Sequence, residues 1–386
     1  MGRVWILIAA VAAIAACQSV PKESSPSGET FRVVAYVAGW SMPAKVPADK
    51  LTHINFAFAR IDEGGRVVFQ DPKFDAALAS LVALKQQQPA LKVLVSVGGW
   101  QADGFSDAAL SDSSRATFAE SAVALIRQHH IDGIDIDWEY PGQGVAGIKF
   151  RAEDKRNFTL LLKALRAALN AASDADGRGD DRYLLTIASA DREYFEHTEM
   201  AKLHVYLDWF NVMAYDFFNS LTPTTGHHAG LHASKYAAPR DRNADKSIRQ
   251  HLAAGIPSRK LVLGVAFYGR RFDGADPTHD GLNRPYQKYA GDPSYAELAE
   301  KFVGRDGFER HWDSRASAPF LWNAATRTFI SYEDPESIGK KAAYARNKKL
   351  GGVMFWELSQ DRDGELLDAL NEVAEKARTR DDGASN

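Results

Sequence analysis

The chain has 386 residues, and its 47 basic and 50 acidic side chains give a formal net charge of −3. This balance argues against nucleic acid as a partner, because proteins that bind a polyanion usually carry an excess of positive charge. The single cysteine excludes an intramolecular disulfide framework and a cysteine-ligated metal cluster. The 29 glycines and 15 prolines are scattered along the chain, which excludes a fibrous or low-complexity protein.

The first thirty residues differ in composition from the rest. Residues 4–16 form an apolar run that follows Arg3. The run is too short to span a bilayer comfortably as a permanent helix, and its length and flanks are typical of a secretory signal. We therefore expect residues 1–16 to be a signal peptide. Residues 17–30, which are rich in Ser, Pro, Glu and Gly, are predicted to be a flexible tether.

The only cysteine stands at the end of this apolar run. Ile14-Ala15-Ala16-Cys17 resembles a bacterial lipobox, in which the cysteine is lipidated and becomes the mature N-terminus. The alternative is a buried structural thiol. Gln18 rather than aspartate follows, and by resemblance to lipoprotein sorting this implies the outer membrane of a Gram-negative cell. Membrane contact is expected through this lipid alone, because no other stretch reaches about 18 uninterrupted apolar residues.

Short β-branched runs then alternate with amphipathic stretches. Candidate strands are 32–37, 52–58, 92–97, 131–137, 184–188, 208–213, 261–266 and 351–356. Helical patterns between them run from Phe74 to Val82 and over 112–129, 153–172, 245–254 and 335–348. Strands separated by helices imply parallel pairing with right-handed crossovers. Eight of them predict an α/β protein with a closed (β/α)₈ TIM barrel.

This alternation breaks once. Residues 268–332 are rich in Gly, Pro, Asp and aromatic residues and are too long for an ordinary loop. They are predicted to form a small α+β insertion between the seventh and eighth strands of a barrel spanning 31–378, with a disordered tail at 379–386. The competing fold is a doubly wound open sheet, but no glycine-rich phosphate loop follows the first strand.

The fourth candidate strand carries a row of acids. Asp135, Asp137 and Glu139 alternate with apolar residues and so share one face of an extended chain. The apolar face must pack under the helices, which turns the acidic face into the barrel. Repulsion and desolvation raise the pKa of crowded carboxyl groups, so at least one should hold a proton near neutral pH. Glu139 is nearest the C-terminal mouth and is therefore the candidate general acid.

Two other interpretations of this row remain open. A structural ion-pair network would need basic partners, and the inward positions of the third and fifth strands show none. A metal site is the second alternative, although the spacing does not match a calcium loop and no nearby pair of histidines is predicted to complete it. A second possible metal cluster, formed by His227, His228 and His232, lacks an acidic neighbour in its short loop, which favours a solvated loop.

The acidic strand resembles the hallmark of family 18 glycoside hydrolases, the chitinase family. The family pattern Asp-x-x-Asp-x-Asp-x-Glu is matched at all four positions, Asp132, Asp135, Asp137 and Glu139. Further family motifs follow in order as Ser96-Val97-Gly98-Gly99 with Trp100 after it, Met213-Ala214-Tyr215-Asp216, and Trp356 at the end of the eighth strand. Tyr268-Gly269-Arg270 resembles the start of the extra α+β domain of the deep-cleft subfamily. The resemblance runs from about residue 31 to 370.

The resemblance implies a retaining, substrate-assisted hydrolysis of β-1,4-linked N-acetylglucosamine, an exception to the usual two-carboxylate scheme. Glu139 would protonate the glycosidic oxygen, and the carbonyl oxygen of the substrate's own acetamido group would attack as the nucleophile. Asp137 would orient that amide and share a proton with Asp135. Tyr215 would donate a hydrogen bond to the acetyl oxygen. No cofactor and no metal are implied.

Sugars present apolar C–H faces, so a cleft with aromatic walls is expected. Trp356 is expected to floor the subsite where the sugar distorts, and Trp100 to stack on the leaving-group side. The full set of expected substrate-binding residues is Tyr36, Phe56, Gly99, Trp100, Tyr140, Met213, Asp216, Tyr268, Arg270 and Trp356. Trp40, Trp312 and Trp322 could extend the cleft or lie buried.

Chitin or chitooligosaccharides are therefore the expected partners of a monomeric enzyme. Two rival functions stay open: a lectin-like binding protein on the same barrel, and an enzyme that acts on another N-acetylglucosamine glycan. Lectin-like relatives usually lose the terminal glutamate, and this chain keeps Glu139.

Overall fold

Eight parallel strands form a ring that closes because β1 pairs with both β2 and β14. In ring order the strands are β1 (Arg32–Ala38), β2 (His53–Ile61), β4 (Lys92–Gly98), β5 (Gly133–Asp137), β6 (Leu184–Ser189), β7 (Trp209–Val212), β8 (Leu261–Ala266) and β14 (Gly352–Trp356). The short β3 (Val67–Val68) pairs antiparallel with the end of β2. The computed structural model describes residues 31–373, and within them the predicted TIM barrel is confirmed.

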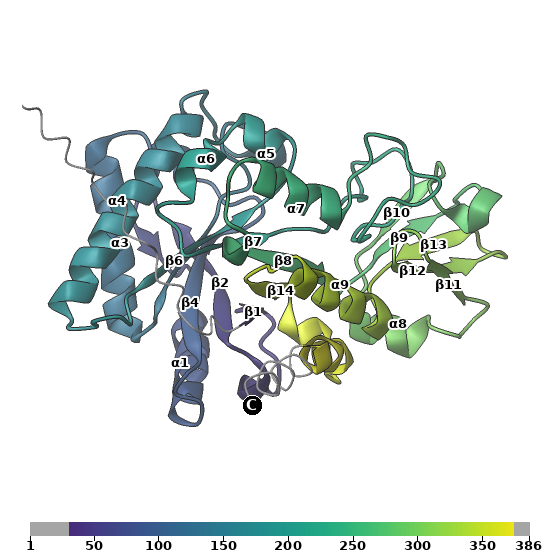
Figure 1. Cartoon of the computed structure of the whole chain (residues 1–386), viewed down its shortest axis with the longest axis horizontal. Helices are drawn as coiled ribbons and strands as arrows, with labels where there is room; N and C mark the ends of the chain where they lie inside the picture. The colour runs from purple at the N-terminus through teal and green to yellow at the C-terminus, as the bar shows by residue number, and fades with distance from the viewer. Residues whose placement is uncertain (1–30, 374–386) are drawn as a thin grey trace, which may run out of the picture. The chain divides into compact units, whose positions relative to one another are not determined.

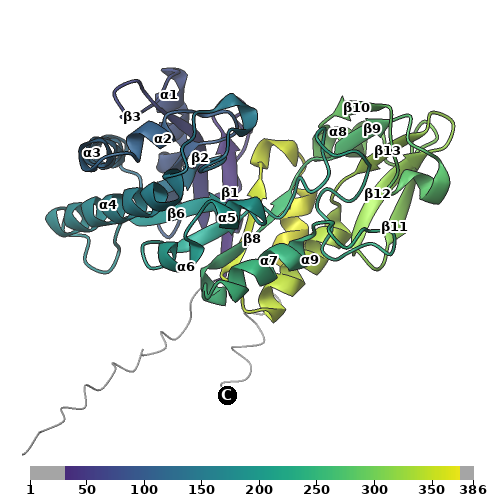
Figure 2. The same cartoon turned by 90° about the horizontal axis from the view of Figure 1, so that it is seen from above.

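Helices cover the outside of this ring (Figure 1, Figure 2). The α-helices of the barrel are α1 (Lys73–Ala83), α2 (Phe105–Ala108), α3 (Asp112–His129), α4 (Asp154–Ala175), α5 (Glu193–Glu196), α6 (Met200–Leu203), α7 (Ala244–Ala253) and α9 (Pro335–Asn347). Short 3₁₀ turns lie at Ala48–Lys50, Leu84–Gln86, Val145–Gly147, Ser258–Lys260, Thr278–Gly281 and Leu358–Gln360. No helix within 31–373 is long and apolar enough to cross a membrane.

Local capping explains where the long helices begin. Ser111 accepts a hydrogen bond from the Ser114 backbone N–H at 3.1 Å, and the Ser114 hydroxyl accepts from the Ser111 N–H in return. Asp334 and Ser337 form the same reciprocal pair at the start of α9, with Pro335 in the first turn. Each cap satisfies backbone donors that have no partner inside the helix.

The side chains of the strands sort into two layers. Outward residues such as Ile134, Ile136 and Val265 belong to a large apolar layer between the strands and the helices. A smaller cluster, which includes Tyr36 and Met354, fills the inside of the barrel. The inner cluster ends at the C-terminal mouth of the barrel, where enzymes of this fold place their chemistry.

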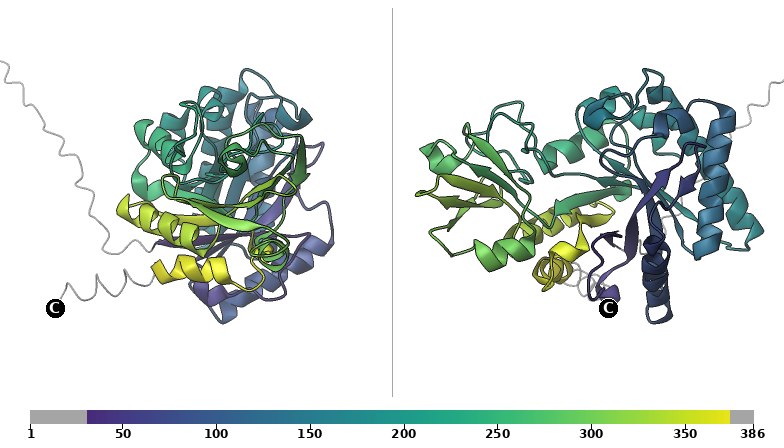
Figure 3. Two further views of the ribbon diagram at one scale, coloured as in Figure 1. Left: turned by 90° about the vertical axis from the view of Figure 1, so that its right-hand side faces the viewer. Right: turned by 180° about the vertical axis from the view of Figure 1, so that it is seen from behind.

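A second sheet lies between β8 and β14 in the sequence and beside the barrel strands in space (Figure 3). It has the order β10 (Lys288–Gly291), β9 (Arg270–Asp273), β13 (Thr328–Ser331), β12 (Ala318–Asn323) and β11 (Glu309–Asp313), all paired antiparallel. The helix α8 (Tyr295–Lys301) belongs to the same stretch. Phe272 and Phe329 are fully buried in its core. These elements occupy the stretch 268–332 that breaks the βα alternation of the sequence.

The predicted signal peptide, the tether of 17–30, Cys17 and the tail of 379–386 lie outside the described residues.

Candidate active site

The acidic row of β5 faces the barrel interior because its other face is anchored to the helices. Trp138 is 1% exposed, stacks on Phe105 with ring centroids 5.2 Å apart, and meets the edge of Phe158 at 5.4 Å. A strand with this apolar face fixed outward must direct the alternate side chains, Asp135 and Asp137, inward. Both are buried, at 0% and 4% exposure.

Asp135 lies deepest and is saturated with hydrogen bonds. Its Oδ2 accepts from the Tyr36 and Ser96 hydroxyls, each at 2.8 Å. Its Oδ1 accepts from the Thr186 hydroxyl at 2.5 Å and the Asn211 amide at 3.1 Å. Burial raises the pKa of Asp135, and the four hydrogen bonds oppose that rise by favouring the carboxylate. With both oxygens used twice, Asp135 is built as an acceptor.

Asp137 differs from Asp135 in lacking such partners. Its Oδ1 is buried without a hydrogen bond. Burial raises the pKa of Asp137 well above its usual value, and the charges of Glu139 and Asp135 raise it further. A proton shared along the row is therefore favoured on Asp137 rather than on Asp135.

Two glycines allow β4 to pack against Asp137. The Gly99 N–H donates to the Asp137 carbonyl at 2.8 Å. A Cβ on Gly98 would lie 2.0 Å from that same carbonyl oxygen, and both glycines have positive φ, 118° and 90°. Only glycine fits such a close backbone approach in this conformation. Gly99 thus acts through its backbone in positioning the catalytic strand.

Glu139 stands at the mouth of the barrel. Burial raises the pKa of Glu139 from 4.5 to about 7, with a further rise from the charge of Asp216, while Tyr140 and the charge of Arg60 oppose the shift. Glu139 is therefore substantially protonated near neutral pH, and it borders the open cleft. A neutral carboxyl group in this position is suited to donate a proton.

Arg60 is a cation that the sequence analysis missed. It lies near the C-terminal end of β2, donates a hydrogen bond to the Gly98 carbonyl, and places its guanidinium carbon 5.4 Å from the centre of the Phe58 ring. Its charge lowers the pKa of both Asp137 and Glu139. The expectation of no basic group beside the row came from the third and fifth strands alone, whereas Arg60 lies on the second.

A second charged group faces Glu139 from the β7 side. Asp216 Oδ1 accepts from the Tyr268 hydroxyl and from Arg270 Nε, both at 2.8 Å, and Arg270 Nη2 lies 2.6 Å from Oδ2. The buried His228 ring lies 3.6 Å away. Burial alone would raise the pKa of Asp216, but His228 and Arg270 outweigh it and hold that pKa well below the usual value. Asp216 is thus a fixed anion.

These groups open into one cleft of about 1090 Å³. Its lining includes nearly all of the predicted site residues: Tyr36, Trp100, Asp137, Glu139, Tyr140, Met213, Tyr215, Asp216, Tyr268, Arg270 and Trp356. Trp356 stacks on Phe58 with ring centroids 5.5 Å apart, and Trp40 lies 6.2 Å from Trp356. Trp40 and Trp100 are 60% and 47% exposed, which leaves both rings available to a ligand.

The prediction that Phe56 lines the cleft is wrong. Phe56 is fully buried on the outer side of β2, where it meets Phe69 at 5.7 Å and Phe74 at 5.5 Å. The residue that lines the cleft is Phe58. The pairing of β2 with β4 shifts register between Ala57 and Ala59, and Phe58 falls at that irregularity, where strand alternation no longer predicts side-chain direction.

Several other candidate residues also lie outside the cleft. Trp322 is 5% exposed, and Trp312 packs against Arg310 and Lys340. Asp132 forms ion pairs with Lys85 at 2.6 Å and Arg178 at 3.2 Å. Asp132, the first acid of the motif, therefore has a structural environment.

The histidines after β7 do not form a metal cluster in the structure. His227 Nε2 lies 3.1 Å from Asp313 Oδ2, whereas His228 faces Asp216. Among residues 31–373, no group of three or more His, Cys, Asp or Glu side chains is arranged to hold a metal ion.

Comparisons with known proteins show which family the chain resembles. Residues 32–361 match the model of "Glycosyl hydrolases family 18". The chain is 36% identical to chitinase A1 of Niallia circulans. The match covers 90% of this chain and 59% of that protein. The chain is 32% identical to chitinase B of Serratia marcescens, covering 88% of this chain and 79% of that protein.

Solved structures show the same similarity. A family 18 N-acetylglucosaminidase from Paenibacillus barengoltzii superposes with a TM-score of 0.84 at 40% identity, covering 89% of this chain and all of that one. A group IV chitinase from Ostrinia furnacalis, solved with allosamidin, gives a TM-score of 0.79 at 28% identity, covering 90% of this chain and 99% of that one. The chain belongs to glycosyl hydrolase family 18.

Proposed function

We propose that this chain is a chitinase that hydrolyses β-1,4-linked N-acetylglucosamine polymers or oligomers with retention of configuration. The observation that carries the proposal is a carboxyl group with a pKa near 7, Glu139, placed at the mouth of a buried acidic row. It lies in a cleft walled by the aromatic rings of Trp356, Phe58 and Trp100, which suit the apolar faces of sugars. The relatives named chitinases support the same substrate class.

The proposed first step breaks the glycosidic bond. The acetamido carbonyl oxygen of the bound sugar attacks its own anomeric carbon, while Glu139 gives its proton to the departing oxygen. The product is an oxazolinium ion on the enzyme and a free chain end. Because this nucleophile belongs to the substrate itself, it gains from proximity, and the enzyme needs no second carboxylate as nucleophile.

Asp137 and Tyr215 are proposed to hold the acetamido group. Both line the cleft, and the unpartnered Oδ1 of Asp137 is an acceptor for the amide N–H. As the oxazolinium develops, the proton of Asp137 passes to Asp135, and the carboxylate left on Asp137 stabilises the neighbouring positive charge. In the second step Glu139, now a carboxylate, takes a proton from water as that water attacks the anomeric carbon, and the bond from this carbon to the acetamido oxygen breaks, which restores the N-acetyl group.

The second sheet supports the finer proposal of a deep-cleft subfamily. Arg270 begins β9 and Tyr289 belongs to β10, and both line the cleft beside the barrel residues. The sheet thus adds a wall to the site.

The experiment is release of reducing ends from chitooligosaccharides by the wild type and by Glu139→Gln. We expect turnover by the wild type and a loss of several orders of magnitude in the variant. Binding without cleavage by the wild type would favour the lectin-like rival. Cleavage of another N-acetylglucosamine glycan, but not of chitooligosaccharides, would favour the second rival.

We also propose that Cys17 is lipidated and anchors the enzyme to the cell envelope, in the outer membrane of a Gram-negative cell. The lipobox-like sequence before it supports this. Mass spectrometry of the wild type and Cys17→Ser should show the lipid on the wild type only. A free N-terminus in the wild type would refute the anchor.

A further inference from the structure

A partly buried ion pair in the cleft wall has no part in the proposed chemistry. Arg242, just before α7, is paired with Asp191, just after β6. The Arg242 side chain is 24% exposed and that of Asp191 4% exposed. The guanidinium carbon also lies 4.9 Å from the centre of the Phe217 ring. Arg242 is thus held by a carboxylate and by an aromatic face, and its direction is fixed before any ligand arrives.

This arginine retains hydrogen-bonding capacity toward the cleft. Arg242 lines the cleft together with Tyr140, Gln143 and Glu193. A guanidinium presents five N–H donors and no acceptor. Since Asp191 takes one end of the group, donors remain for the hydroxyl and carbonyl oxygens of a ligand.

The position of Arg242 indicates which part of the substrate it meets. Trp356, the proposed floor of the cleaved sugar, belongs to β14 and packs with Tyr36 of β1. Asp191 and Arg242 follow β6 and β7, across the mouth of the barrel. The proton donor Glu139 marks the bond to be broken. A chain that continues past Glu139 and away from Trp356 therefore runs toward Tyr140 and Arg242.

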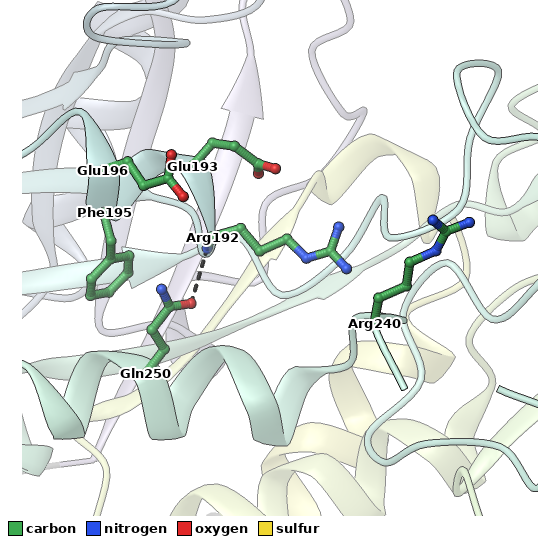
Figure 4. Close-up of a pocket in the computed structure, with 6 residues that line it drawn as sticks. All are labelled: Arg192, Glu193, Phe195, Glu196, Arg240 and Gln250. Carbon is green, nitrogen blue, oxygen red and sulfur yellow. Dashed lines mark hydrogen bonds between the residues drawn. The ribbon is translucent and has the colours of Figure 1, made fainter. Parts of the chain in front are cut away.

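A second hollow of about 560 Å³ is lined by Arg192, Glu193, Phe195, Glu196, Arg240 and Gln250 (Figure 4). Glu193 lines both the cleft and this hollow. The Arg192 N–H donates to Gln250 Oε1 at 2.9 Å and so links the segment after β6 to α7. The shared Glu193 places this hollow next to the Arg242 side of the cleft.

We propose that Arg242, preorganised by Asp191 and Phe217, is a specificity-determining residue that binds an N-acetylglucosamine unit on the leaving-group side of the cleaved bond. The inference rests on the proposed function. It predicts that Arg242 discriminates between a sugar and a non-sugar leaving group, because an aryl group offers no hydroxyl or amide oxygen to the guanidinium.

The test compares N-acetylglucosamine hexasaccharide with an aryl β-glycoside of diacetylchitobiose. Arg242→Met keeps the side-chain volume over Phe217 and removes the donors. We expect kcat/KM to fall about tenfold more for the hexasaccharide than for the aryl glycoside, through KM, as for loss of one hydrogen bond from a charged donor. Equal losses on both substrates, or no loss on either, would overturn the proposal.

Two further variants keep the test decisive. Arg242→Met leaves a buried carboxylate unpaired, which can destabilise the fold, so Arg242→Met/Asp191→Asn removes both charges and should show the same discrimination. Arg249→Met is the matched control, because Arg249 on α7 is 60% exposed and pairs with Asp245 at 2.9 Å. This control should leave kcat/KM unchanged for both substrates.

If the wild type cleaves neither substrate, the proposed function fails while the binding claim is still tested. Calorimetry with the hexasaccharide then compares Glu139→Gln with Glu139→Gln/Arg242→Met. Binding about tenfold weaker in the double variant supports the role of Arg242. Equal binding overturns it.

Discussion

Replacing Glu139 by glutamine should make the folded chain increasingly more stable than the wild type as the pH rises. The folded chain holds the pKa of Glu139 at about 7, mainly through burial, against a usual value of 4.5. Between these two values the unfolded chain has released a proton that the folded chain keeps. The wild type therefore loses stability as the pH rises through this window, whereas glutamine has no proton to lose.

The size of the effect follows from the pKa shift. A shift from 4.5 to about 7 corresponds to about 3 kcal/mol at about 1.4 kcal/mol per pH unit. Glu139 borders an open cleft and is not fully buried, so solvent screening reduces the expected value to about 2 kcal/mol. The difference in unfolding free energy between Glu139→Gln and the wild type should grow by this amount between pH 4 and pH 8.

Urea denaturation at the two pH values measures this difference, since unfolding free energy falls linearly with denaturant. The exposed Glu120 on α3 supplies a matched control, Glu120→Gln. A difference that stays constant with pH, or that turns against Glu139→Gln as the pH rises, would refute the assignment of a raised pKa to this side chain.

Three further predictions concern neighbouring residues. Arg60→Met removes a charge that lowers the pKa of Glu139, so the alkaline limb of kcat/KM against pH should move up by about one unit; a limb that stays or moves down contradicts this. Asp137→Asn should lower kcat about 100-fold or more while ligand binding, followed by calorimetry, changes little; equal losses would argue against a transition-state role. Phe56→Ala should cost about 3–5 kcal/mol in denaturation with kcat/KM retained, whereas Phe58→Ala should weaken substrate binding; the reverse outcome would restore Phe56 to the cleft.

The barrel could be predicted from the sequence because its strands are buried on both faces. Such strands read as short β-branched runs, and all eight were found within a few residues of their true ends. The direction of the acidic side chains on β5 could also be predicted from the sequence. Strict alternation over Asp135–Glu139 leaves one arrangement in which Trp138 packs under the helices.

Side-chain direction could not be predicted where the pairing of a strand is irregular. Phe56 and Phe58 are both phenylalanines on one strand, and only the register shift at Ala57–Ala59 decides which of them meets the cleft. That shift depends on the pairing of β2 with β4, which a single sequence does not contain.

The charged groups around Glu139 could be predicted from the sequence only in part. Asp216 and Arg270 were expected in the cleft through the family resemblance, but their mutual ion pair is a feature of the folded chain. Arg60 and the Arg242–Asp191 pair carry no local sequence signal. They reach the site from separate segments, so their role depends on tertiary packing alone.

The pH dependence of kcat/KM for the wild type tests the central claim most directly. If Glu139 is the proton donor, activity on a chitooligosaccharide should fall along an alkaline limb with a midpoint near pH 7, because the carboxyl group is lost as an acid above its pKa. A limb with its midpoint near 4.5, the usual value for a glutamate, would contradict it.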